Sequence, residues 1–152
     1  MVKSRLNWYI EEKNVLDISQ SGFRKNRSTL DHLLTLQQDI LTAFQNKEHL
    51  YAIFFDMEKA YDKAWRYKIL QILHSIGIRG HLANFIKNFL SNRSFRVLVN
   101  DTYSSLHSLE NGVPQGSVLS PTLFILLINE VSKIIKPPVC LRMFADDINI
   151  SI

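Results

Sequence analysis

Three aspartates stand where this sequence could bind metal ions. Asp56 follows an apolar run, and the adjacent pair Asp146 and Asp147 lies at the tip of a second apolar segment. Adjacent carboxylates repel each other, so a pair between apolar strands costs stability unless water or a cation offsets the charge. Mg²⁺ prefers oxygen ligands, and two such ions about 4 Å apart activate a hydroxyl and stabilise a leaving group. The same dipeptide is common in ordinary hairpin turns, so by itself it favours a turn.

Three predicted strands would carry these aspartates. Tyr51–Phe55 is short and nearly all apolar, which is typical of a buried strand, and Asp56 directly follows it. Val139–Phe144 and Ile148–Ile152 are predicted as the arms of a hairpin. The intervening residues, which include the Asp pair, would form its tight turn.

Apolar spacing and capping residues predict the remaining elements. A helical stripe follows Ser28, which with Asp31 resembles a capping box, and Asn46 and Lys47 would end this helix. The same signals predict a short amphipathic helix over 6–13, helices over 65–76 and 82–90 with Gly77 ending the first, and a hairpin over 95–109. A last helix is predicted to end before Pro137, with Ser120 as its cap and Pro121 as its first helical residue. The mixture of strands and helices argues for an α+β domain.

Composition agrees with one folded, mildly basic domain. Of 152 residues, 46% are hydrophobic, and the formal net charge of +4 fits a polyanionic partner such as nucleic acid, although many unrelated domains are as basic. Cys140 is the only cysteine, so no disulfide partner is expected, and its apolar neighbours predict burial. The histidines lack the spacing of a zinc site. The N-terminus does not resemble a signal peptide, and the longest apolar run, Leu123–Ile128, is too short to span a bilayer. We therefore expect an intracellular protein that is not secreted and has no membrane partner.

Four blocks of residues, in order along the chain, carry a resemblance to one protein family. Gln20–Thr29 (QSGFRKNRST) resembles the family's QxGFRxxRST block, and Phe54–Asp62 (FFDMEKAYD) resembles its first catalytic motif, FxDxxKAFD. Gly112–Pro121 (GVPQGSVLSP) is the longest and most specific match, and Phe144–Asp147 (FADD) is the last. The blocks extend over nearly the whole chain, and their order resembles that in reverse transcriptases of non-long-terminal-repeat retrotransposons. Together they most resemble insect elements of the jockey group.

The resemblance implies an α+β fold, the reverse-transcriptase palm: a small antiparallel sheet that carries the three acids, with helices packed on one face. The strand before Asp56 should then lie beside the hairpin. Asp56 and Asp146 would coordinate two Mg²⁺ ions, for which Mn²⁺ could substitute, and Asp147 would complete the catalytic and metal site. The resemblance also implies one partial domain over 1–152, with 1–49 leading in from fingers and palm, 50–152 as the palm core, and fingers and thumb largely missing.

A nucleotide-binding set is implied by the same resemblance. Tyr61 would be the aromatic steric gate against a 2′-hydroxyl, and Gln115 would face the incoming nucleotide. Lys59 and Ala60 belong to the segment whose backbone amides would contact the triphosphate. Plainer interpretations exist: Tyr61 as a core aromatic, Gln115 as an exposed loop amide, and Lys59 as an ion-pair partner of Asp62.

The resemblance predicts an enzyme, an RNA-directed DNA polymerase, with RNA template, DNA primer and deoxynucleoside triphosphates as partners, in the nucleus and/or cytoplasm. Arg24 and Arg27 could contact nucleic-acid phosphates or could be solvated loop charges. Without fingers and thumb, the isolated chain is expected to have little or no activity, because positioning contributes much of the rate. The alternative is a truncated or co-opted retroelement product that binds nucleic acid without catalysis. An unrelated metal-dependent phosphohydrolase would leave Gly112–Pro121 and Tyr61 without a role.

Overall fold

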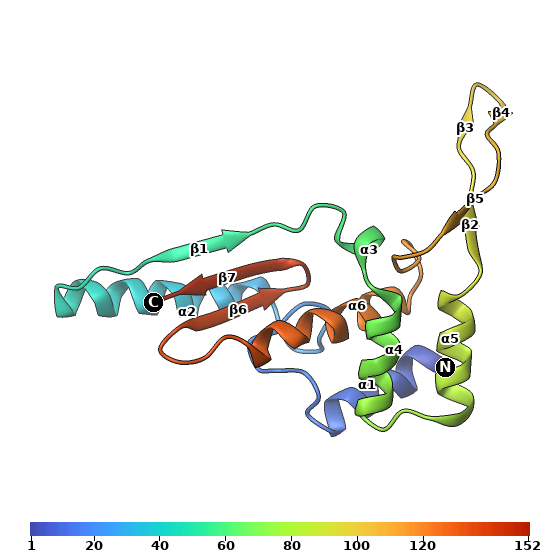
Figure 1. The fold of residues 1–152 in the computed structure, drawn as a ribbon. Coiled ribbons are helices and arrows are strands. Elements are labelled where there is room, and N and C mark those ends of the chain that lie inside the picture. Colours follow the sequence, from blue (N-terminus) through green and yellow to red (C-terminus); the bar gives the residue numbers. More distant parts are fainter.

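The structure, a computed structural model, describes all residues 1–152 (Figure 1). Its elements in chain order are α1 (Val2–Glu12), α2 (Thr29–Asn46), β1 (Ala52–Phe55), α3 (Ala60–Lys63), α4 (Arg66–Ser75), α5 (Gly80–Leu90), β2 (Arg93–Phe95), β3 (Leu98–Val99), β4 (Thr102–Tyr103), β5 (His107–Leu109), α6 (Ser120–Ile128), the 3₁₀ helix η1 (Asn129–Lys133), β6 (Cys140–Phe144) and β7 (Asp147–Ser151). None of the helices is both long and apolar enough to cross a membrane.

The sheet that carries the aspartates has three antiparallel strands in the order β1-β7-β6. β6 and β7 form the hairpin, and their last pair before the turn is Phe144 with Asp147. β1 pairs with β7 in a register that ends at Phe55 opposite Ile148. The prediction that the strand preceding Asp56 lies beside the hairpin is therefore confirmed. In Figure 1, the end of β1 and the β6–β7 turn lie at the same end of the sheet.

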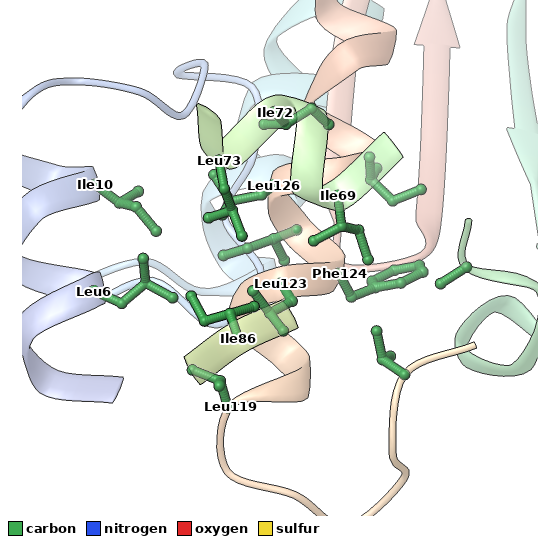
Figure 2. Close-up of a cluster of buried hydrophobic side chains, with 14 of the residues drawn as sticks. Leu6, Ile10, Ile69, Ile72, Leu73, Ile86, Leu119, Leu123, Phe124 and Leu126 are labelled. Carbon is green, nitrogen blue, oxygen red and sulfur yellow. The ribbon is translucent and has the colours of Figure 1, made fainter. Parts of the chain in front are cut away.

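One face of this sheet belongs to the hydrophobic core. Met143 and Ile148 are a cross-strand pair, and both join a buried cluster of 19 residues that draws on α1, α4, α5 and α6. Figure 2 shows the centre of that cluster, where Leu123 and Phe124 of α6 lie among side chains from α1, α4 and α5. α6 is buried almost all round. The sheet that carries the site is thus packed on the main hydrophobic core.

Helix α2 lies against the opposite face of the sheet, whereas the sequence predicts helices on one face only. Side chains alternate along a strand, so Arg142 points away from the core face that holds Met143. Arg142 forms an ion pair with Asp39 of α2 and donates a hydrogen bond of 3.0 Å to the Thr35 hydroxyl. The apolar stripe of α2 gains little cover, since Leu33 is 61% and Phe44 is 73% exposed.

Most local sequence signals are confirmed. Asp31 accepts a hydrogen bond of 2.7 Å from the Ser28 amide in the predicted capping box, and Lys47 adopts a left-handed conformation directly after α2. Gly77, with φ of +88°, follows the end of α4. The predicted hairpin also forms, with β2 paired to β5 and β3 paired to β4, and it projects from the body in Figure 1.

Three local predictions are wrong. β1 is not buried, because it is an edge strand, and its Phe54 is 69% exposed. Cys140 is exposed because it begins the other edge strand. Ser120 is not the cap of α6. Leu119 holds that position, and the Ser120 hydroxyl instead donates a hydrogen bond of 2.6 Å to the Pro114 carbonyl.

Candidate active site

The three predicted aspartates lie at one end of the sheet. Asp147 is the first residue of β7, Asp146 lies in the turn before it, and Asp56 is the first residue after β1. Continuing the β1–β7 register by one step places Asp56 opposite Asp147. These two residues also line the same pocket, a cavity of about 350 Å³ between the sheet and α2.

Asp146 faces a second, neighbouring pocket of about 510 Å³. The pocket is lined by all four residues that the sequence resemblance assigned to nucleotide binding: Lys59, Ala60, Tyr61 and Gln115. Burial raises the pKa of the Tyr61 phenol, and the negative charge of Asp146 raises it further. The structure therefore brings the predicted nucleotide-binding residues together around one of the three carboxylates.

The donor chemistry at this end of the sheet fits a hard divalent cation. Asp56, Asp146 and Asp147 supply only carboxylate oxygens, the ligands that Mg²⁺ prefers. None of the three takes part in a salt bridge, so their charges are not offset by a basic side chain. They are not gathered into a finished site, because nowhere do three acidic, histidine or cysteine side chains converge as metal ligands. The three side chains are thus ligands of the type that Mg²⁺ prefers. Asp56 and Asp147 line one pocket, and Asp146 lines the neighbouring one.

Tyr61 packs against the hydrophobic core and also lines the predicted nucleotide pocket. Its ring stacks on the buried Phe124 with a centroid separation of 4.7 Å and an interplanar angle of 13°. Its backbone carbonyl accepts a hydrogen bond of 2.8 Å from the Val113 amide. These contacts match the core-aromatic interpretation, while the position of the residue in the pocket wall matches the functional one. The packing fixes the ring, which a steric role requires.

Gln115 is exposed but not free. Its side-chain amide donates a hydrogen bond of 2.9 Å to the Asp62 carboxylate, so Asp62 is joined to Gln115 and not to Lys59. The segment that leads to Gln115 is also held in place at Gly112, whose φ is +86°. A Cβ there would lie 2.7 Å from the Asp62 carbonyl oxygen. Glycine is required at this position both for its conformation and for the close approach of the two backbones.

Arg66 is a residue of the site region that sequence reasoning missed. It is only 8% exposed and donates hydrogen bonds to three backbone carbonyls: Gly112 at 2.7 Å, Leu109 at 2.7 Å and Asn111 at 2.5 Å. Burial lowers its pKa, and the nearby charge of Arg93 lowers it further. The partners of Arg66 are all backbone carbonyl groups, which no side-chain pattern in the sequence could indicate. Arg66 anchors the chain just before the turn that carries Gln115.

The two arginines proposed as phosphate contacts lie in different settings. Arg24 donates two hydrogen bonds, of 3.0 and 2.7 Å, to the Glu11 carboxylate and one of 2.9 Å to the Asp17 carbonyl. Its side chain is 10% exposed, so this placement favours a structural role that ties the loop to α1. Arg27 is exposed and precedes the cap of α2. It is the better placed of the two to meet a phosphate.

Comparison with known proteins agrees with this geometry. Residues 1–152 match the family model described as "Reverse transcriptase (RNA-dependent DNA polymerase)". The chain therefore belongs to the reverse transcriptase family. It is 35% identical over 124 residues to the probable RNA-directed DNA polymerase from transposon BS of Drosophila melanogaster, an alignment that covers 82% of this chain and 14% of that protein. It is 33% identical over 135 residues to the RNA-directed DNA polymerase from mobile element jockey of Drosophila funebris, covering 85% of this chain and 15% of that protein.

These relatives confirm the predicted resemblance to jockey-like, non-long-terminal-repeat elements. The chain spans about one seventh of the length of the curated relatives it matches. Among solved structures, it resembles the telomerase from Candida tropicalis in complex with the TWJ fragment of telomeric RNA. The TM-score is 0.72 at 17% identity, with 99% of this chain and 28% of the other covered. That likeness confirms the predicted palm-type fold.

Proposed function

We propose that the chain is the palm segment of an RNA-directed DNA polymerase. The observation that carries the proposal is the meeting of Asp56 with the Asp146-Asp147 turn at one end of the sheet, beside the pocket of Tyr61 and Gln115. In the proposed reaction, a primer 3′-hydroxyl attacks the α-phosphate of a deoxynucleoside triphosphate and pyrophosphate leaves. The family match and the relatives' names support this choice.

In this proposal Asp56, Asp146 and Asp147 hold two Mg²⁺ ions, with Mn²⁺ as a possible substitute. Bound there, the ions would activate the hydroxyl and stabilise the charge of the leaving group. The chain's own task is to orient the reactants. The ring of Tyr61 is held by its stacking contact, and Gln115 by its hydrogen bond to a carboxylate. Both side chains can therefore limit where a nucleotide lies.

The proposed partners are an RNA template, a DNA primer and deoxynucleoside triphosphates, inside the cell in the nucleus or cytoplasm. Lys59 and Ala60 line the pocket where backbone amides would meet a triphosphate, and the exposed Arg27 is the proposed phosphate contact. We also propose that 1–49 leads in from fingers and palm and that 50–152 forms the palm core. The net charge of +4 suits a polyanionic partner.

A second candidate function is a non-catalytic one. In that case, the isolated chain would bind Mg²⁺ or nucleic acid without extending a primer. The exposed apolar side chains of α2 and β1 favour this candidate for the chain by itself, because contiguous apolar surface commonly marks a face that another segment covers. Primer extension by the purified chain, above the level of a triple Asp→Asn variant, would remove this candidate.

The direct test is primer extension on an RNA template by the polymerase that carries this segment. Asp56→Asn should lower the rate at least about 100-fold, a loss typical of removing one group that stabilises transition-state charge. Asp101→Asn is the matched control, because Asp101 is exposed at the tip of the β3–β4 hairpin, and asparagine tolerates its φ of +61°. Full activity of the Asp56→Asn enzyme would contradict the proposed function.

A further inference from the structure

We propose that Gln20 is a positioning residue that holds the turn carrying Asp146. The inference rests on the proposed function of that aspartate. Gln20 lies in the loop between α1 and α2, 125 positions before Ala145, and makes no contact with the nucleotide pocket. It would act through the backbone of Ala145, the residue immediately before the Asp pair.

The contacts of Gln20 converge on that backbone. Its side-chain oxygen accepts a hydrogen bond of 3.1 Å from the Ala145 amide and one of 2.7 Å from the Gly22 amide. Its side-chain nitrogen lies 3.5 Å from the Ala145 carbonyl oxygen. Gln20 is fully buried, so water cannot replace these bonds without rearrangement of the surrounding chain.

Ala145 needs such support because its conformation is unfavourable. Its φ of +58° lies in the left-handed region, which non-glycine residues seldom occupy. Residues held in such conformations persist only where the surroundings determine them. The next residue is Asp146, so a change at Ala145 would turn the direction in which the Asp146 carboxylate points. Gln20 is the side chain that hydrogen-bonds Ala145 on this turn.

The backbone around Gln20 follows β6 up to the turn. Met143 exchanges two hydrogen bonds with this segment, donating to the Ser19 carbonyl at 2.8 Å and accepting from the Ser21 amide at 2.9 Å. A Cβ on Gly22 would lie 2.2 Å from the Ala145 nitrogen, so the two backbones are in direct contact. The loop thus fixes Gln20 against the turn with little freedom to shift.

The test compares variants of the full polymerase that carries this segment. Gln20→Met keeps the length of the side chain and removes both accepted hydrogen bonds. It should lower kcat at least about tenfold, since a catalytic group displaced by about 1 Å costs up to about 100-fold. The KM for the nucleotide should stay within about twofold, because Gln20 does not line the nucleotide pocket.

Amide hydrogen exchange supplies the readout that a merely structural role would not move. In Gln20→Met the Ala145 amide should exchange at least about fivefold faster, the equivalent of one lost hydrogen bond, while core amides of α6 stay protected. Gln37→Met, an exposed glutamine on α2, is the matched control and should change neither quantity. An unchanged kcat, or a fall in kcat with general loss of protection, would overturn the inference.

Two precautions keep the outcome decisive. If Gln20→Met does not fold, Gln20→Asn replaces it, because the amide then retreats by one methylene, about 1.5 Å, and loses Ala145 while remaining polar. If the unsubstituted polymerase extends no primer, the proposed function fails, and the Ala145 exchange rate in the same variants still decides whether Gln20 holds the turn. Normal exchange in both Gln20→Met and Gln20→Asn would refute it.

Discussion

Replacing Arg66 with methionine should destabilise the chain by about 3 kcal/mol, with the loss originating in the loop before Gln115. The arginine donates three hydrogen bonds, none longer than 2.7 Å, to backbone carbonyls of 109–112. Methionine keeps most of the side-chain volume and can donate none of them. The carbonyls would then lose a charged partner at a place that is buried at Gly112 and part-buried at Leu109 and Asn111.

The magnitude follows from opposing contributions. Hydrogen bonds to a charged group contribute about 1.5–3 kcal/mol each, so three of them give roughly 4.5–9 kcal/mol before costs. Arg66 is 8% exposed, so the loss of guanidinium hydration offsets a large part of this sum. The remainder of about 3 kcal/mol corresponds to a fall in Tm of about 6–12 °C in a domain of this size.

Denaturant-induced unfolding of the purified chain measures this change. The midpoint should fall with an unchanged slope, because the native fold remains the same. Arg66→Lys should recover no more than about half of the loss, since a lysine ammonium cannot match the fixed fork of a guanidinium. Arg5→Met, on the exposed side of α1, is the control and should stay within about 0.5 kcal/mol. A cost below about 1 kcal/mol for Arg66→Met, or full recovery by lysine, would refute the reasoning.

Three further predictions concern charge and exposure. Asp146→Asn should lower the raised pKa of Tyr61 toward its usual value, whereas Asp56→Asn should leave that pKa unchanged, as NMR titration of the tyrosine ring can show. Burial alone would raise the pKa of Glu130, but hydrogen bonds from two lysines outweigh it and lower that pKa. The stability from Glu130 is therefore present above its unfolded pKa of about 4.3 and is lost as the pH falls below it. Glu130→Gln should accordingly flatten the acid limb of unfolding measured against pH. Cys140 should react with a thiol reagent in the native chain as fast as in denaturant, and slow native labelling would contradict its exposed position.

The sequence predicted the elements of the site well because their signals are local. A strand ending in Asp56 and a hairpin turn at Asp146 each follow from a few neighbouring residues, and the family blocks indicated that the two meet. Burial of β1 could not be predicted in the same way. Whether an apolar strand is central or lies at an edge depends on how many strands the sheet contains, which no single strand encodes. The apolar stripe of α2 likewise indicates a helix face but not whether anything covers it.

The roles of Arg66 and Gln20 could not be predicted from the sequence, for a different reason. Arg66 and Gln20 both act on backbone groups, and their partners lie 43–46 and 125 positions away in the sequence. Carbonyls and amides are present at every position, so no residue type marks the partner. Sequence patterns identify groups that react, and they seldom identify the groups that hold a backbone in place.

The strand order also determines how long β1 stays unpaired while the chain is synthesised. Within residues 1–152, β1 pairs only with β7, and β7 comes later in the chain than every other strand. At about 5–20 residues per second, a growing chain leaves β1 unpaired for roughly 5 to 20 seconds on the ribosome. During that interval, exposed apolar side chains such as Phe54 and a free backbone edge are open to other chains. The order of the strands therefore makes chaperone protection most valuable before Asp147 emerges, and any interruption of translation upstream of that residue would leave β1 without a partner.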